Sequence, residues 1–77
     1  MDIMLADAAA LRLALAALTA RDASRAATDH MVALICARNA GIKVSAREIV
    51  KAEKAHNAAG HAYTQAFQAC RAAGLAL

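Results

Sequence analysis

The side chains best suited to chemistry in this 77-residue chain are its histidines, cysteines and glutamates. Glu53 and His56 have the Glu-x-x-His spacing that supplies two metal ligands from one helix in di-iron bundles. Such bundles need several more inward-facing glutamates, and the chain adds only Glu48. We therefore expect no metal and no cofactor. His56 is expected instead to face His30 in a polar layer that fixes how the helices align.

The two cysteines, Cys36 and Cys70, stand far apart and lack the spacing of a metal motif. Both are expected to be buried, reduced thiols. A catalytic cysteine needs a base nearby, and Cys36 has only Arg38 as a basic neighbour in the sequence. The three glycines are isolated, so no loop is built to cradle phosphates. These observations predict that the protein is not an enzyme.

Three cations follow the turn region at helical spacing. Arg47, Lys51 and Lys54 stand at i, i+4 and i+7, so they form a basic stripe on one helix face. Such a stripe suits either phosphates or an acidic protein surface. The net charge of +3 and the pI near 9.3 allow both partners. Glu48 and Glu53 are interleaved with the cations, which leaves open an ordinary solvated face.

The residues before this stripe suggest an alternative function. Residues 36–42, with Ala37 and Gly41 four apart, resemble the first helix and turn of a helix-turn-helix motif. The resemblance implies that residues 47–54 form a recognition helix that enters the major groove of DNA. Arg47 departs from the motif, which usually has an apolar residue there, and the helix that follows is longer than a recognition helix. A helix-turn-helix-like DNA-binding regulator is therefore the alternative.

A turn at residues 41–45 divides the chain into two helical halves. Gly41 suits the left-handed position that ends a helix. Ser45 and Glu48 have the spacing of a capping box, which begins one. The composition favours helix throughout, with 25 alanines and no proline. We predict one helical domain over 1–77, with helices at about 3–40 and 46–74.

Small apolar residues recur at three-and-four spacing in both halves, which predicts an alanine-rich seam between two helices. In the first half they are Ala9, Leu13, Ala16, Ala20, Ala23, Ala27, His30, Leu34 and Ala37. In the second half they are Ala52, Ala55, Ala59, Ala62, Ala66, Ala69, Ala73 and Ala76. Beside them runs a column spaced by seven, as in coiled coils: Ile49, His56, Tyr63, Cys70 and Leu77. The second half resembles the Alacoil class of antiparallel helix pairs, a packing motif that implies no activity. We predict an all-α fold, a long antiparallel helical hairpin.

A second arrangement stays open because the larger apolar residues change sides near residues 20–24. Leu11, Leu15 and Leu18 share one face, whereas Met31 and Ile35 lie on another. A helix break near 20–24 would give a compact three-helix bundle that encloses all of them.

The hairpin predicts a surface as well as a fold. We name Leu11, Leu15 and Leu18 the leucine patch; these residues lie off the seam, and two helices alone cannot bury them. An exposed apolar patch marks an interface. We expect the chain to form a homodimer, with four helices in one bundle, or to bind another protein. It would then be an interaction module, such as the adaptors and inhibitors that phages encode.

The first residues are expected to be a poor signal peptide. Asp2 and Asp7 replace the basic residues of a signal peptide. The apolar run over 11–18 is interrupted by Arg12 and is too short to cross a membrane. We expect a cytoplasmic protein without a membrane partner.

Overall fold

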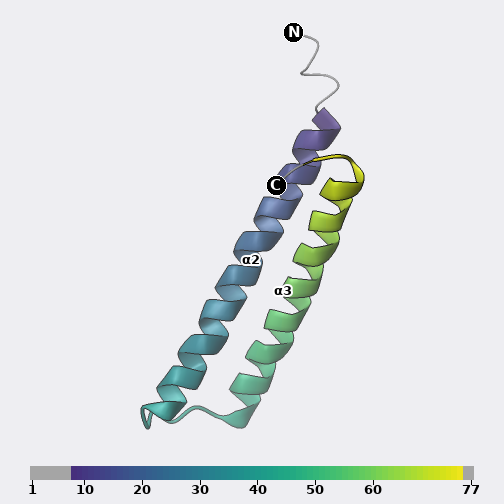
Figure 1. Ribbon diagram of the computed structural model, residues 1–77. Helices are drawn as coiled ribbons and strands as arrows, with labels where there is room; N and C mark the ends of the chain where they lie inside the picture. The colour runs from purple at the N-terminus through teal and green to yellow at the C-terminus, as the bar shows by residue number, and fades with distance from the viewer. Residues whose placement is uncertain (1–7, 76–77) are drawn as a thin grey trace.

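The computed structural model describes residues 8–75, which form an antiparallel pair of helices (Figure 1). Helix α2 spans Ala8–Asn39 and helix α3 spans Ala46–Ala72. At 1.5 Å per residue they are about 48 Å and 40 Å long. The predicted all-α helical hairpin is therefore confirmed. Residues 3–7 of the expected first helix lie outside the described residues.

Helix α2 continues through residues 20–24 without a break. No second turn divides the first half of the described chain, so the three-helix alternative is not the fold. Alanine, leucine and arginine favour helix, and the polar residues in this stretch are compatible with a helix interior. Thr28 shows how, because its hydroxyl donates a hydrogen bond to the Ser24 carbonyl oxygen at 2.9 Å, one turn earlier in the helix.

The turn is built by the residues that predicted it. Gly41 has φ of +88°, in the left-handed region. The Ile42 N–H donates to the Ala37 carbonyl at 2.9 Å and the Gly41 N–H donates to the Arg38 carbonyl at 3.1 Å, which is the Schellman pattern.

The start of α3 is capped as the sequence predicts. The Glu48 N–H donates to Ser45 Oγ at 3.1 Å, and the Ser45 N–H donates to Glu48 Oε2 at 3.1 Å. This reciprocal pair is the capping box, and it satisfies two backbone donors that a bare helix start would leave without partners.

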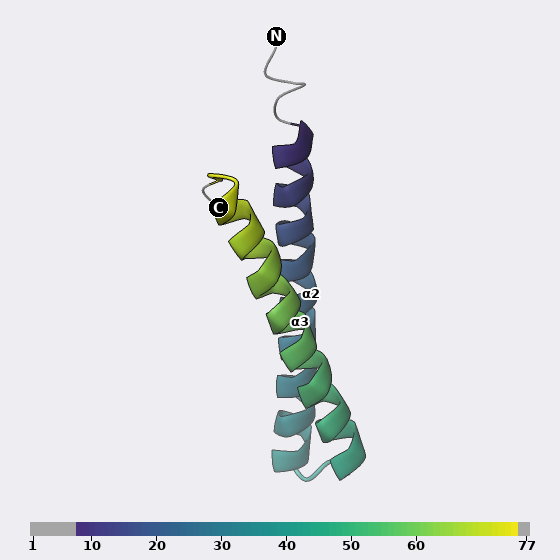
Figure 2. The same cartoon turned by 90° about the vertical axis from the view of Figure 1, so that its right-hand side faces the viewer.

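The helices are not parallel rods. Figure 2 shows α3 crossing α2, so that it lies to one side of α2 near the turn and to the other side at the open end. The chain measures 58 × 18 × 15 Å along its principal axes, which is one helix pair thick. Most contacts between residues far apart in the sequence are therefore made across a single helix–helix face, and both outer faces of residues 8–75 remain open.

The face that α2 turns toward α3 differs from the predicted one. Ala17 is the buried residue of this helix, whereas Ala16, Ala23 and His30 of the predicted stripe are exposed. Half-buried residues on either side of Ala17 include Ala10, Leu13, Ala14, Ala20, Ser24, Ala27, Thr28, Met31, Leu34 and Ile35. Compared with the prediction, α2 is rotated about its own axis, so that Met31 and Ile35 are partly covered in place of Ala23 and His30. More apolar surface leaves water as a result.

The face of α3 follows the column spaced by seven. Ile49 and Cys70 from that column are buried, together with Ala52. Of the predicted alanine stripe, Ala55, Ala62, Ala69 and Ala73 are exposed. The stripe is therefore only partly the seam, and its other half lies on an outer face of the hairpin. Leu77 and Ala76 lie outside the described residues.

Candidate interaction surface

The leucine patch is exposed on α2 near the open end of the hairpin. The exposed fractions are 59% for Leu11, 54% for Leu15 and 37% for Leu18. Four-and-three spacing places the three side chains in one row on the helix surface. Helix α3 does not cover this row, because α3 lies against a different face of α2. The structure thus leaves the predicted contact residues open to solvent.

A groove beside the patch extends the surface onto α3. Its volume is about 310 Å³, and its lining residues are Ala17, Leu18, Arg21, Arg25, Tyr63 and Phe67. The Tyr63 and Phe67 rings pack at 6.1 Å between centroids and tilt by 55°. Both side chains are half-buried. Leucine and aromatic surface therefore meet on the same side of the hairpin.

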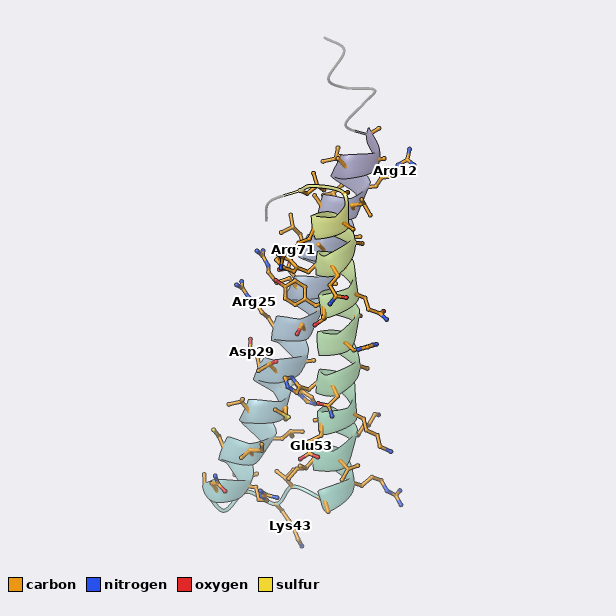
Figure 3. The ribbon with its side chains drawn as sticks, turned by 45° about the vertical axis from the view of Figure 1, so that its right-hand side comes forward. Arg12, Arg25, Asp29, Lys43, Glu53 and Arg71 are labelled. Atoms are coloured by element: carbon orange, nitrogen blue, oxygen red, sulfur yellow. The ribbon has the colours of Figure 1, made fainter. Side chains whose placement is uncertain are left out.

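Two arginines, Arg21 and Arg25, line this groove. In Figure 3, Arg25 and Arg71 project to the same side of the hairpin, one from each helix. Arg21 Nε is buried and has no hydrogen-bond partner, while the end of its guanidinium lies 3.5 Å from Asp22. An apolar surface rimmed by charged groups is the usual composition of a protein–protein contact.

Four-and-three spacing continues past the leucine patch. Asp22, Arg25, Asp29 and Val32 follow Leu18 at the same intervals, and all four are exposed. In Figure 3, Arg25 and Asp29 project from the same side of α2. The sequence does contain a signal for this longer row, namely the regular spacing of four and three residues. The change from apolar to charged side chains along the row makes that spacing hard to recognise.

The basic stripe lies at the other end of the hairpin, near the turn. Arg47, Lys51 and Lys54 are exposed on α3. Among the described residues the ion pair is Arg21–Asp22, so these three cations are free of carboxylate partners there. The structure does not bring the stripe and the leucine patch together; they are separate surfaces.

A second groove, of about 280 Å³, lies between the helices near the basic stripe. His30, Leu34, Glu48, Lys51, Ala52 and Ala55 line it. Lys51 is the member of the basic stripe that reaches it. The exposed Ala55 and His30 place this groove on the opposite side of the hairpin from the aromatic groove.

The turn does not have the geometry of a helix-turn-helix motif. Helices of that motif cross at about 90–120°. Here α2 and α3 run antiparallel and pack along their lengths (Figure 1). Residues 47–54 are also the first part of a 27-residue helix, not a short recognition helix.

The predicted histidine layer is wrong. His56 Nδ1 lies 2.9 Å from Thr28 Oγ1, and His30 is exposed. A hydroxyl has one hydrogen, and Thr28 donates it to Ser24, so the pair is complete when His56 Nδ1 carries a proton and donates it. The partner of His56 stands two residues earlier than predicted because α2 turns its seam toward Met31 and Ile35.

The cysteines divide into one buried and one exposed thiol. Cys70 is fully buried, as its predicted place at the helix contact implies. Its Sγ–H donates to the Leu13 carbonyl at 3.2 Å. Cys36 is exposed, contrary to the expectation that both thiols are buried. Cys36 follows Val32 by four residues and so lies at the end of the same row on α2.

Residues 8–75 contain neither a cluster of potential metal ligands nor an apolar segment of membrane-spanning length. No three His, Cys, Asp or Glu side chains in this part of the chain gather closely enough to hold a metal ion. Within the same residues, neither helix contains a window apolar enough to cross a bilayer.

Comparison of the chain with protein-family models, curated proteins and solved structures gives no match.

Proposed function

We propose that this chain is a non-catalytic helical interaction module that acts by binding a protein surface through the leucine patch. The exposure of Leu11, Leu15 and Leu18 in one row carries the proposal. Burying a leucine side chain completely contributes about 1.5–3 kcal/mol, so leaving three of them half in water is costly unless a partner covers them.

The surface favours a helix as its partner. A row at four-and-three spacing is the pattern that one helix presents to another in coiled-coil packing. A helix laid along it would turn the hairpin into part of a helical bundle, whether that helix belongs to another protein or to a second copy. A chain that covers a helix of another protein in this way could act as an adaptor or as an inhibitor. The two free cysteines favour the reducing cytoplasm as the place of action.

The substitution Leu15→Glu tests this proposal. A carboxylate in the centre of the row would have to be desolvated on binding, so we expect association to weaken by at least about tenfold. Sedimentation equilibrium measures self-association, and capture from host lysate with and without nuclease measures binding to other proteins. Helical content by circular dichroism should stay unchanged because Leu15 is exposed in the hairpin.

Ala23→Glu is the matched control. It places the same charge at an exposed position on another face of α2. Association that survives Ala23→Glu and is lost in Leu15→Glu assigns binding to the leucine patch. Equal association of all three proteins would contradict the proposal.

Nucleic acid is the second candidate partner, through the basic stripe. The observation in its favour is that Arg47, Lys51 and Lys54 are exposed and lack carboxylate partners among the described residues. Removing one phosphate-binding cation reduces the steepness of log K against log salt by about one. Lys51→Glu should therefore weaken binding to a DNA duplex and flatten that slope, measured by fluorescence anisotropy; identical curves would leave the stripe as a solvated face.

A further inference from the structure

We propose that the partner of the leucine patch is a second copy of this chain, packed with its α2 antiparallel to the first α2. The two-fold axis would pass between Asp22 and Arg25 on α2 and close to Gly60 on α3. This inference rests on the proposed function, since it names the partner of the same surface. Three observations support it.

First, the leucine patch is one part of a longer row. Alternating steps of four and three residues connect Leu11, Leu15, Leu18, Asp22, Arg25, Asp29, Val32 and Cys36, and every one of these residues is exposed. Such a row follows one face of a helix. It extends over about 38 Å at 1.5 Å per residue. The face is thus long enough to pack against a whole helix and not only against a short segment.

Second, the row is complementary to itself when it is reversed. Around an axis between Asp22 and Arg25, Asp22 lies opposite the partner's Arg25 and Arg25 lies opposite the partner's Asp22. Two reciprocal ion pairs therefore form at the centre. Towards the ends, Leu15 lies opposite the partner's Val32, and Leu11 lies opposite the partner's Cys36. The layer that does not match is that of Leu18, which lies opposite the partner's Asp29.

The charged groups at the centre are available for these pairs. Within the described part of the chain, Arg25 and Asp29 belong to no ion pair. Asp22 makes a contact of 3.5 Å with the neighbouring Arg21, and its side chain is 70% exposed. Charges that are placed symmetrically about an axis select the antiparallel alignment, because the parallel one would set Asp22 against Asp22 and Arg25 against Arg25.

Third, Gly60 has no reason within the hairpin to be glycine. A glycine in a helix interior is destabilising relative to alanine. A Cβ built on Gly60 meets nothing within 4 Å, so the described chain has room for a side chain there. A close approach of another backbone is the remaining structural use of such a residue.

Gly60 also lies at the level of the proposed axis. On one side of it His56 is hydrogen-bonded to Thr28, and on the other Tyr63 lines a groove with Arg21 and Arg25. Gly60 is therefore level with residues 24 and 25 of α2. Phe67 stands two turns further along the same face of α3, so Gly60 and the aromatic groove are on one side of the hairpin. The dimer would then be a bundle of four helices, in which the antiparallel helix pair of one chain crosses the antiparallel pair of the other.

A charge exchange tests the antiparallel alignment of the two α2 helices. Both exchanged side chains are exposed, so the fold of the hairpin should be kept. Asp22→Arg gives a chain with two central arginines, and Arg25→Asp gives a chain with two central aspartates. Each alone should dimerise at least about tenfold more weakly than wild type, since like charges face each other across the axis. An equal mixture of the two should form a heterodimer as tight as the wild-type dimer, measured by sedimentation equilibrium and native mass spectrometry. Arg12→Asp, an exposed charge reversal away from the row, should leave dimerisation unchanged.

Gly60→Ala provides the independent test of the close approach. The substitution should weaken the dimer while the helical content of the hairpin is kept or raised, because the hairpin itself has space for the methyl group. A dimer of wild-type strength in Gly60→Ala would overturn the position of the axis. Failure of the mixed charge variants to restore a dimer would overturn the ion pairs.

The two proposals fail in different ways. A wild-type chain that stays monomeric at its highest soluble concentration overturns the second-copy inference. If Leu15→Glu still abolishes capture of another protein in that case, the proposed function stands with a different partner. If Leu15→Glu changes neither self-association nor capture, both proposals fail.

Discussion

At the scale of single residues, the bond between Thr28 and His56 is one of two polar contacts that join the helices among the described residues; the other is the Cys70 thiol on the Leu13 carbonyl. Thr28→Val keeps the shape of the side chain and removes the hydroxyl, so His56 loses its partner at a half-buried position. Leaving such a group without a hydrogen bond costs about 1–3 kcal/mol. We expect the free energy of unfolding, measured by urea titration with circular dichroism, to fall by roughly 1 kcal/mol.

Thr64→Val is the control for this prediction. Thr64 makes the same bond within its helix, to the Gly60 carbonyl at 3.0 Å, but is exposed and touches no residue of α2 through its hydroxyl. It should therefore leave stability nearly unchanged. An equal loss of stability in both variants would show that the helix-internal bond matters and that the interaction with His56 does not.

The two thiols should differ in their reactivity. Cys36 is exposed, whereas Cys70 is fully buried beneath the start of α2. At concentrations low enough to keep the chain monomeric, a maleimide reagent should modify one thiol per chain quickly and the second only as fast as the hairpin opens, because access limits the reaction. Mass spectrometry of labelled Cys36→Ser and Cys70→Ser variants identifies which is which. Rapid labelling of Cys36→Ser in the folded state would contradict the burial of Cys70.

At the scale of helices, the capping box sets where α3 begins. Ser45→Ala removes the acceptor of the Glu48 N–H and should lower the free energy of unfolding by about 1 kcal/mol. Glu48→Gln keeps a side-chain oxygen that can accept from the Ser45 N–H, so it should cost less. The measurement is again urea titration; a larger decrease for Glu48→Gln than for Ser45→Ala would assign the effect to charge and not to capping.

Helix boundaries near the turn could be predicted because they depend on local chemistry. The left-handed conformation of Gly41 and the reciprocal bonds of Ser45 and Glu48 each need only residues within a few positions. Such rules act in any fold. The hairpin follows from them, since a short turn between two helices makes them antiparallel neighbours.

Which face of α2 meets α3 could not be predicted in the same way. Alanine occupies several faces of the helix, so periodicity alone does not separate a seam centred on Ala16 from one centred on Ala17. The choice depends on the sum of small gains along both helices, above all on covering Met31 and Ile35. Rotating α2 about its axis by the angle between adjacent residues, about 100°, is enough to replace the predicted His30–His56 layer with Thr28 and His56.

The candidate site also has a part that the sequence predicts and a part that depends on how the helices pack. Exposure of the leucine patch follows because the chain has more apolar residues than a two-helix contact can cover, and the sequence shows that excess. The aromatic groove joins Leu18 and Arg25 to Phe67, which stand more than 40 positions apart in the chain. Only the alignment of the two helices brings them together, and the sequence pattern predicts that alignment to within about one helical turn, not to the residue.

At the scale of the whole molecule, the hairpin has very little core. Its buried residues among those described are Ala17, Ile49, Ala52 and Cys70, two of them alanines. Small domains need additional support such as metals, disulfides or oligomers when a single core is this limited. Both cysteines are free, and no metal cluster is present in residues 8–75. The association proposed above would supply such support to this part of the chain.

Stability should therefore depend on protein concentration. Ligand binding to the folded state raises the melting temperature by mass action, and a second copy acts as such a ligand. We expect the melting temperature of the wild-type chain to rise with concentration over two or three decades, measured by circular dichroism at low and high concentration. Leu15→Glu should melt at a lower temperature that no longer varies with concentration, whereas Ala23→Glu should keep the wild-type dependence. A wild-type melting temperature that is constant over the whole range would mean that the four buried residues and the helix caps suffice, and the leucine patch would then be held open for a different protein.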